Sequence, residues 1–301
     1  MGNIYLAADS GGSKTVFLLV DEKGTVLTEV KTEGMGAVRA GVLPIRDIIK
    51  TAKEKIDIFG KPKAIFLSLG GPNTKEVYDE LSTAWENGGR LIYVGAGTSG
   101  RLAVQDAAEC TVTYGVEKGT VTAIIAGGKN AVFTSYENVE DDFEAGANAV
   151  KELDITDKDS IVGISASGTA AFVCGALSEG KRVGCVTIAF LCNESGKITE
   201  YADHAINVIT GPEVIGGSTR MKAGTAQKLV LNMFSTIAMI KLGRVTGNQM
   251  TYMKPSNKKL VKRARSIVAE VCKISYEQAD RLLLKYDNDM QKAIEAFEKG
   301  E

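Results

Sequence analysis

The clearest candidate for chemistry in this sequence is a glycine-rich loop between an expected strand and an expected helix. The strand covers residues 91–94, and the loop continues as Gly95-Ala96-Gly97-Thr98-Ser99-Gly100. Unpaired backbone amides at a helix N-terminus favour an anion, and the hydroxyls of Thr98 and Ser99 add donors there. The Gly-x-Gly-x-x-Gly spacing also fits a dinucleotide fingerprint, but the acidic residue that such a site needs, Glu117, follows a turn instead of a second strand. The loop therefore predicts a phosphate site.

A second loop repeats these features. An expected strand at 161–165 leads into a run that contains Ser165, Ser167, Gly168 and Thr169, and a helix is expected to follow. One such loop alone is usually no more than a helix N-cap. Two of them, at the carboxyl ends of strands in one parallel sheet, indicate a single phosphate gripped from both sides.

Three glutamates could supply acid–base catalysis. Glu109 ends the helix that follows the first loop and has small apolar neighbours, so we expect burial to raise its pKa and let it act as a general acid near neutral pH. Glu137 and Glu140 stand at the start of another expected helix. Each could simply favour the helix dipole there, so the spacing alone leaves a catalytic role open. The single histidine, His204, lies beside an expected strand and is expected to be a surface or capping residue.

Composition excludes several classes of protein. The 301 residues carry 36 basic and 37 acidic side chains, a net charge of −1, which gives no electrostatic basis for binding nucleic acid or an anionic membrane. Five cysteines without a CxxC pair and one histidine make no zinc-ligand set, so we expect no metal and free, buried thiols. The chain begins without a basic signal region, and no apolar stretch reaches the roughly 18 residues of a membrane span. We therefore expect a cytoplasmic protein.

An α/β fold must position these candidate residues. After about residue 75, β-branched strands alternate with helices, which predicts a parallel sheet with helices on both faces. After Pro255, three short helices are expected, with the basic cluster at 258–265 on a solvated face. We predict three parts, residues 1–72, 73–252 and 253–301. The expected elements before 253 are strands at 4–8, 16–20, 26–30, 64–69, 91–94, 121–126, 161–165, 183–189 and 205–209, and helices at 45–58, 75–86, 102–109, 140–153, 170–177 and 219–242.

Residues 87–250 closely resemble the N-acetylmuramic acid 6-phosphate etherases of the sugar isomerase (SIS) domain superfamily, and the helices up to residue 301 resemble that family's tail. The matching blocks are residues 89–101 (GRLIYVGAGTSGR) and 211–228 (GPEVIGGSTRMKAGTAQK). The resemblance implies a SIS-type parallel sheet sandwiched by helices. It also implies a reaction without a cofactor: loss of D-lactate from C3 of N-acetylmuramic acid 6-phosphate, then addition of water to give N-acetylglucosamine 6-phosphate.

The resemblance further implies roles for single residues. Glu109 matches the acid that protonates the departing lactate oxygen, and Glu140 matches the second catalytic glutamate, expected to be the base that takes the C2 proton of the ring-opened sugar. Family members are homodimers whose site is completed across the interface, so we expect a homodimer here. The phosphate is expected on Thr98, Ser99, Ser165, Ser167, Gly168 and Thr169, with further substrate contacts from Glu137, Ser218, Thr219 and Lys222.

Two departures from the family pattern keep a second function open. Where the family has Ser-Gly-Arg-Thr-Pro, this chain has Ser167-Gly168-Thr169-Ala170-Ala171 and so lacks an arginine in the phosphate loop. The N-terminal segment of the etherases is also expected to be missing, apart from its last helix at 75–86. The alternative is a regulatory protein that binds sugar phosphates without turnover, as the related glucokinase regulatory proteins do.

The segment 1–72 resembles another family, the N-acetylglucosamine kinases and BadF/BadG ATPases. Their first phosphate motif is similar to a run between two expected strands that includes Asp9, Gly11, Gly12, Ser13, Lys14 and Thr15. The resemblance implies a partial actin-like ATPase lobe. That fold needs a second lobe with an adenosine pocket, which we do not find, so the motif is expected to be vestigial and the lobe to serve packing or dimerisation. An ATP-dependent sugar kinase is the third alternative.

Overall fold

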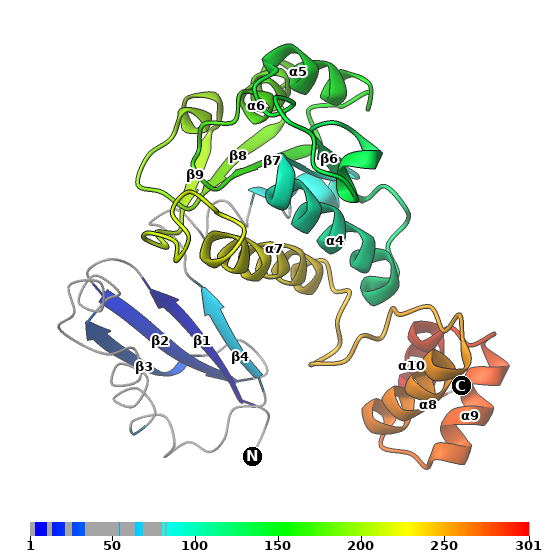
Figure 1. The fold of residues 1–301 in the computed structure, drawn as a ribbon. Coiled ribbons are helices and arrows are strands. Elements are labelled where there is room, and N and C mark those ends of the chain that lie inside the picture. The colour runs from blue at the N-terminus through cyan, green and yellow to red at the C-terminus, as the bar shows by residue number, and fades with distance from the viewer. Residues whose placement is uncertain are drawn as a thin grey trace. The chain divides into compact units, whose positions relative to one another are not determined.

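The structure is a computed structural model, and it describes residues 4–10, 14–21, 26–33, 54, 64–68, 80–81 and 83–300. The chain divides into two compact units. One holds Met1–Glu76 with Ile206–Val208, and the other holds Val77–Ala205 with Ile209–Glu301. Figure 1 shows their elements as ribbons. The boundaries expected at 72 and 252 remain predictions.

A four-stranded mixed sheet forms the described part of the first unit. Its strands are β1 (Ile4–Ser10), β2 (Lys14–Asp21), β3 (Val26–Glu33) and β4 (Ala64–Ser68). The order is β3-β2-β1-β4, with β4 parallel to β1 and the other two pairs antiparallel. The four predicted strands are confirmed. Apart from Glu54, which is helical, the helix predicted at 45–58 lies outside the described residues, as do Gly11, Gly12 and Ser13.

A five-stranded sheet forms the centre of the second unit, although Ile206 and Asn207 of its last strand are counted with the first unit. Its strands are β5 (Leu91–Gly95), β6 (Val121–Ile125), β7 (Ser160–Ser165), β8 (Val186–Leu191) and β9 (His204–Asn207). The order is β6-β5-β7-β8-β9, and the first three of these pairs are parallel. All residues of β5 and β7 are buried, as expected for central strands of a parallel sheet covered on both faces. The predicted α/β class is confirmed.

Helices cover both faces of this sheet, α4 and α7 on one side and α5 and α6 on the other (Figure 1). They are α4 (Gly97–Tyr114), α5 (Phe143–Lys151), α6 (Ala171–Val183) and α7 (Lys222–Lys241). Successive side chains of β5 point to opposite faces of the sheet, as in any β-strand. Ile92 and Val94 belong to the apolar cluster that includes Phe172 of α6. Tyr93 instead donates its hydroxyl to Asp106 of α4.

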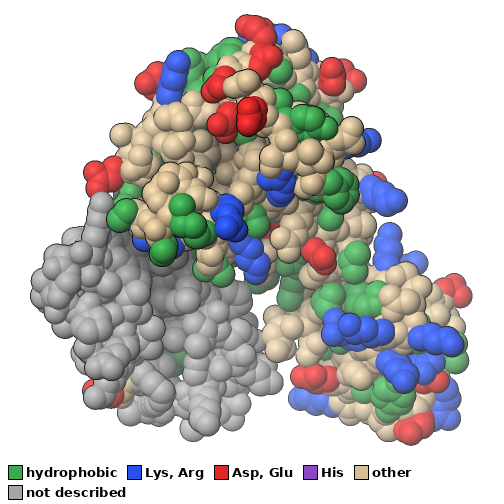
Figure 2. Space-filling view, viewed as in Figure 1, with side chains coloured by type: hydrophobic (Ala, Val, Ile, Leu, Met, Phe, Trp, Pro, Cys, Tyr) green, Lys and Arg blue, Asp and Glu red, His purple; other side chains and the backbone are tan. Residues whose placement is uncertain are grey.

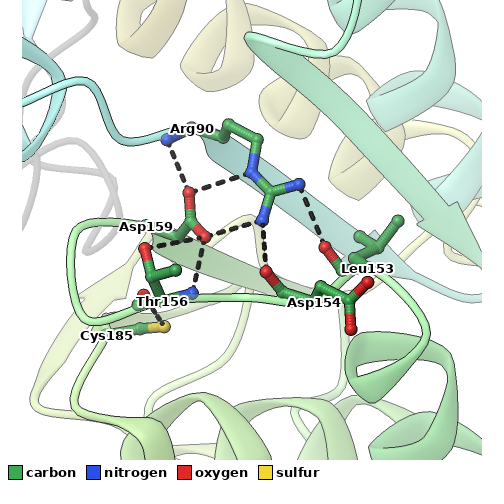
Figure 3. Close-up of polar contacts among 6 residues, drawn as sticks. All are labelled: Arg90, Leu153, Asp154, Thr156, Asp159 and Cys185. Atoms are coloured by element: carbon green, nitrogen blue, oxygen red, sulfur yellow. Dashed lines mark hydrogen bonds and ion pairs between the residues drawn. The ribbon is translucent and has the colours of Figure 1, made fainter.

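An ion pair joins the amino ends of β5 and β7 (Figure 3). Asp159 accepts from the backbone amide, Nε and Nη2 of Arg90 at 2.8, 3.0 and 2.8 Å, and from the Thr156 amide at 2.8 Å. The guanidinium also donates to the carbonyls of Leu153 and Asp154, at 3.1 and 3.2 Å. Burial alone would raise the pKa of Asp159, but these hydrogen bonds hold it below its usual range. Parallel strands run away from this pair, so it lies opposite the two candidate phosphate loops and serves the fold.

Three capped helices follow at the C-terminus, as predicted. They are α8 (Lys258–Cys272), α9 (Tyr276–Lys285) and α10 (Met290–Glu298), and side chains of Asn257, Ser275 and Asp289 cap them. They share an apolar cluster that includes Val268, Leu283 and Ile294. Lys and Arg side chains gather over these helices (Figure 2). The predicted solvated basic face is confirmed for the exposed side chains Lys258, Lys259, Lys262 and Arg263.

The cysteines are free, as predicted. Burial raises the pKa of Cys110, Cys185 and Cys192 each to about 12, which keeps these thiols protonated at neutral pH. Among the described residues, no three His, Cys, Asp or Glu side chains gather as metal ligands would. No helix in the described ranges has the length and apolarity to cross a bilayer.

Candidate functional site

The two candidate phosphate loops lie side by side at the carboxyl end of the sheet. Gly95 and Ile164 are register partners in the adjacent parallel strands β5 and β7. The chain passes from β5 to β6 on one side and later enters β7 on the other, so the loops flank the point where the strand order reverses. This adjacency agrees with the sequence analysis, whereas phosphate binding itself remains a prediction.

The first loop is tighter than predicted, because α4 begins at Gly97 instead of residue 102. Thr98 and Ser99 therefore lie within the first turn of the helix. A Cβ on Gly95 would lie 2.7 Å from the Gly100 nitrogen, so glycine is needed where the strand meets the helix. The N-cap residue, Ala96, provides no side-chain hydrogen bond, and the first turn has no acidic residue. The positive end of α4 is thus left without a neutralising side chain, which favours an anion there.

The start of α7 lies against this loop. Ser99 is buried and donates its hydroxyl to Oε1 of Gln227 at 3.0 Å. A Cβ on Gly224 would lie 3.3 Å from Cγ2 of Thr98, so these two residues also face each other. Lys222 opens the same helix and is exposed. The structure thus brings three predicted site residues, Thr98, Ser99 and Lys222, to one corner of the sheet.

The second loop contains two exposed hydroxyls that contact each other. Ser167 Oγ and Thr169 Oγ1 are 2.7 Å apart, and the Thr169 amide donates to Ser167 Oγ at 3.3 Å. Ser165 is buried and accepts from the Gly168 amide at 3.1 Å, which closes the turn. Gly168 has a φ of +79°, a conformation that favours glycine. While one hydroxyl of the exposed pair donates to the other, the second keeps a proton that can turn toward an anion, and Ser165 holds the loop.

Glu140 lies next to the second loop. Its carbonyl accepts a hydrogen bond from the Phe172 amide, in the first turn of α6, at 2.9 Å. Its side chain is exposed, as is that of Glu137. α5 begins at Phe143 instead of residue 140, because Asp142 caps it through the Ala145 amide. Glu140 therefore precedes the helix, and its carboxylate is free of a capping role.

Arg101 connects the first loop to the segment that leads to Glu140. Its Nε donates to the Val132 carbonyl at 3.0 Å, and its Nη2 lies 3.3 Å from the Thr134 carbonyl and 3.4 Å from Ser135 Oγ. Arg101 is the last residue of the matching block 89–101, but no role could be predicted for it from the sequence. Its place at the start of the second turn of α4, directly after the candidate phosphate loop, was the available signal.

The structure does not bring Glu109, the predicted general acid, to the two loops. Ten residues separate it from Ser99, which corresponds to about 15 Å along the helix axis. Its side chain is exposed, so the prediction that it would be buried is wrong for the single chain. The buried face of α4 instead passes through Ala103, Asp106 and Cys110, and Glu109 lies beside that face.

Within the block 211–228, Glu213 accepts hydrogen bonds from the first backbone amides of α7. Glu213 accepts from the amides of Lys222 and Ala223, both at 2.9 Å, and these bonds lower its pKa. They also explain why the helix predicted from 219 begins at Lys222. Thr219 is exposed and Ser218 half-buried in the preceding loop, and neither makes a side-chain contact that assigns it to the substrate.

Two further polar residues lie away from the loops. Asp106 is buried between α4 and α7, where it accepts from Asn232 at 2.7 Å, Tyr93 at 3.1 Å and Ser235 at 3.2 Å. Burial raises its pKa, and these hydrogen bonds oppose the rise. His204 is half-buried, with Nε2 2.7 Å from Glu80 Oε2, so it is a paired structural residue instead of a surface one.

Comparison with known proteins shows what this chain is similar to. A family model described as the glucokinase regulatory protein N-terminal SIS domain matches residues 74–181. The N-acetylmuramic acid 6-phosphate etherase of Christiangramia forsetii is 47% identical over 225 residues, 75% of this chain and 82% of that one. The etherase of Staphylococcus epidermidis is 40% identical over 264 residues, 88% of each chain. A solved phosphoheptose isomerase from Francisella tularensis is 19% identical, with a TM-score of 0.45 over 66% of this chain and 100% of that one.

The second of these relatives also corrects an expectation about the N-terminus. Its 264 aligned residues exceed the 229 that lie from residue 73 to the end, so the similarity reaches into the segment before residue 73. The prediction that the family's N-terminal segment is missing except for one helix is therefore wrong in part. With these identities over most of both chains, the protein belongs to the N-acetylmuramic acid 6-phosphate etherase family.

Proposed function

We propose that this chain is a carbon–oxygen lyase that cleaves the lactyl ether of N-acetylmuramic acid 6-phosphate, giving N-acetylglucosamine 6-phosphate and D-lactate. The observation that carries the proposal is the grouping of two hydroxyl-bearing loops, an uncapped helix N-terminus and Glu140 at one edge of the sheet. A site for such a substrate needs hydroxyl and amide donors for the phosphate and a carboxylate base within reach of the sugar. The 47% identity to an etherase supports the reaction itself.

In this mechanism the loops hold the 6-phosphate, with Thr98 and the amides of α4 on one side and Ser167 and Thr169 on the other. Glu140 takes the C2 proton of the ring-opened sugar, which is acidic because it lies next to the C1 aldehyde. The C3–O bond breaks as a double bond forms between C2 and C3, and Glu109 protonates the departing lactate oxygen. Water then adds its hydroxyl to C3 and a proton to C2.

We further propose a homodimer in which Glu109 acts in the partner's site. About 15 Å along α4 from Ser99, Glu109 is farther away than a hexose phosphate extends from its phosphorus to its C3 oxygen. The same face of α4 carries Val112, whose side chain is 47% exposed. A partner chain that covers this face would bury Val112 and Glu109 together. The burial predicted for Glu109 is then supplied by the second chain.

The test is a lactate-release assay on the purified protein with N-acetylmuramic acid 6-phosphate. Release that Glu109→Gln and Glu140→Gln each abolish would support the lyase. A second candidate, a regulator without turnover, is favoured by the lack of an arginine in the loop Ser167-Gly168-Thr169 and by the regulatory-protein model over residues 74–181. Absence of release together with a rise in melting temperature on adding the sugar phosphate would support that candidate.

We also propose that the chain consists of three parts, residues 1–72, 73–252 and 253–301. We propose a cytoplasmic location, because free cysteines suit a reducing compartment. The order β3-β2-β1-β4, with Asp9 near the end of β1 and Lys14 at the start of β2, is compatible with a partial ATPase-like lobe. The etherase similarity that extends into this segment favours a packing role over nucleotide chemistry. Millimolar ATP with magnesium should then leave the melting temperature unchanged, and a rise would support a kinase.

A further inference from the structure

Gln227 is a buried polar residue that the proposed mechanism does not use. It lies in the second turn of α7, is only 1% exposed, and accepts the hydroxyl proton of Ser99 at 3.0 Å. Ser99 is itself only 7% exposed and lies in the uncapped first turn of α4. The contact joins residues that are 128 positions apart, and it couples α7 to the first phosphate loop.

The orientation of this amide leaves a buried donor without a partner. Nε2 of Gln227 is buried and makes no hydrogen bond. An amide nitrogen carries two N–H groups, and buried N–H groups without a partner are rarer in proteins than buried carbonyl oxygens with spare capacity. Turning the terminal amide by half a rotation would place Nε2 against Ser99, which lowers the number of buried N–H groups without a partner from two to one and leaves the oxygen unpaired instead. The last torsion of glutamine is broad and permits this rotation.

The direction of the hydrogen bond decides what Ser99 can do. When Ser99 donates to Gln227, its only proton points toward α7, and the hydroxyl has no proton left for an anion. A phosphate dianion accepts hydrogen bonds and does not donate them, so Ser99 would then present lone pairs to it. When Gln227 donates instead, Ser99 accepts from the amide and its proton is free to point out of the α4 N-terminus.

We propose that Gln227 is a positioning residue that donates from Nε2 to Ser99 Oγ and thereby turns the Ser99 hydroxyl proton toward a bound phosphate. The inference rests on the sugar-phosphate site of the proposed function, and it adds to that site a residue that does not touch the ligand. It accounts for a buried amide that contacts the Ser99 hydroxyl while its own nitrogen has no partner. It also predicts that affinity depends on a residue in the second turn of α7, whereas the two loops lie at the starts of α4 and α6.

A double-mutant cycle tests this relation. The four proteins are the parent, Ser99→Ala, Gln227→Met and the double variant, and isothermal titration gives the Kd of each for inorganic phosphate and for N-acetylglucosamine 6-phosphate. Methionine keeps the length of glutamine and removes its hydrogen bonds. We expect Gln227→Met to weaken binding by about tenfold in the parent and to have almost no effect when Ser99 is already alanine.

A second variant keeps the proposal falsifiable if the methionine variant folds poorly. Gln227→Glu has nearly the same shape, and in its ionised form the carboxylate can only accept, so it fixes the Ser99 proton toward α7 and should weaken phosphate binding by more than tenfold at a pH high enough to ionise it. The melting temperature of each variant shows that it is folded. Equal Kd values for the parent and Gln227→Glu, or an equal loss from Gln227→Met with and without Ser99, would overturn the inference.

The same measurements separate this inference from the proposed function. A parent that binds the sugar phosphate and shows the expected cycle, but releases no lactate, would leave Gln227 in its role and remove the lyase activity. A parent that releases lactate but shows additive losses in the cycle would support the lyase activity and overturn the role of Gln227. A parent that binds neither ligand would overturn both.

Discussion

The carbonyl of Glu140 accepts a hydrogen bond from the Phe172 amide, with 2.9 Å between the two atoms. Phe172 lies in the first turn of α6, immediately after the loop that carries Ser167 and Thr169. The proposed base is therefore anchored through its backbone, and its carboxylate remains free to meet the substrate. This arrangement separates the positioning of Glu140 from its chemistry, so the two can be tested by different substitutions.

Replacing Glu140 by glutamine should remove the chemistry and keep the position. The amide side chain leaves the Phe172 hydrogen bond intact, but it cannot take the C2 proton. We expect kcat for lactate release to fall by about a thousandfold, with KM changed by less than about threefold. The matched control is Glu144→Gln, an exposed residue in the first turn of α5, which should behave as the parent. A Glu140→Gln protein with normal turnover would remove this residue from the mechanism.

The assignment of Glu109 to the partner's site predicts complementation between two inactive variants. Glu109→Gln and Glu140→Gln chains, co-expressed or mixed under exchange, should form heterodimers with one site that has both glutamates. With random pairing, about a quarter of the parent activity should return. If Glu109 acted within its own chain, each site of the heterodimer would lack one glutamate and the mixture would stay inactive.

Arg101 should control the segment that leads to Glu140 without touching the substrate. Arg101→Met removes the hydrogen bonds to the carbonyls of Val132 and Thr134, so that segment can shift. We expect kcat/KM to fall by about tenfold, because small displacements of a catalytic group are costly. Hydrogen exchange should become faster at residues 132–136, and Arg281→Met on α9, an exposed residue, should change neither measurement. Faster exchange without a loss of activity would show that the segment does not position Glu140.

The features that the sequence predicted well are those that depend on neighbouring residues. Both candidate phosphate loops could be predicted because a buried strand, glycines, hydroxyls and a helix follow one another within a few positions. Boundaries were less accurate. The strand predicted at 183–189 is β8 at Val186–Leu191, because α6 continues to Val183 and ends at Gly184, whose φ of +96° suits a helix C-terminus.

Features that depend on distant residues could not be predicted in this way. The small neighbours of Glu109 suggested burial, but Ala108 is itself exposed, and the face of α4 that packs is set by the sheet and by α7. The contact between Ser99 and Gln227 spans 128 positions, and no local pattern marks it. Periodicity along α4 does place Ser99, Asp106 and Cys110 on one face, and this signal would have identified the buried side of the helix.

The ion pair between Arg90 and Asp159 should stabilise the fold in a pH-dependent way and leave catalysis alone. Asp159→Asn should lower the free energy of unfolding at neutral pH by about 3 kcal/mol, because it leaves the guanidinium with a weaker partner. The pKa of Asp159 is lowered in the folded protein, so its contribution is complete above the ordinary aspartate pKa of about 4 and is lost as pH falls toward the lower, folded value. The difference between parent and variant should therefore shrink in acid.

Urea unfolding of both proteins at neutral pH and at about pH 3 measures this change. Asp157→Asn, an exposed aspartate in the same turn, is the matched control and should stay within about 0.5 kcal/mol of the parent. Below its melting temperature the Asp159→Asn protein should keep the parent kcat, because the pair lies at the amino ends of β5 and β7 and the loops lie at the carboxyl ends. A difference in stability that stays constant from neutral to acid pH would show that packing around Asp159, and not its charge, stabilises this end of the sheet.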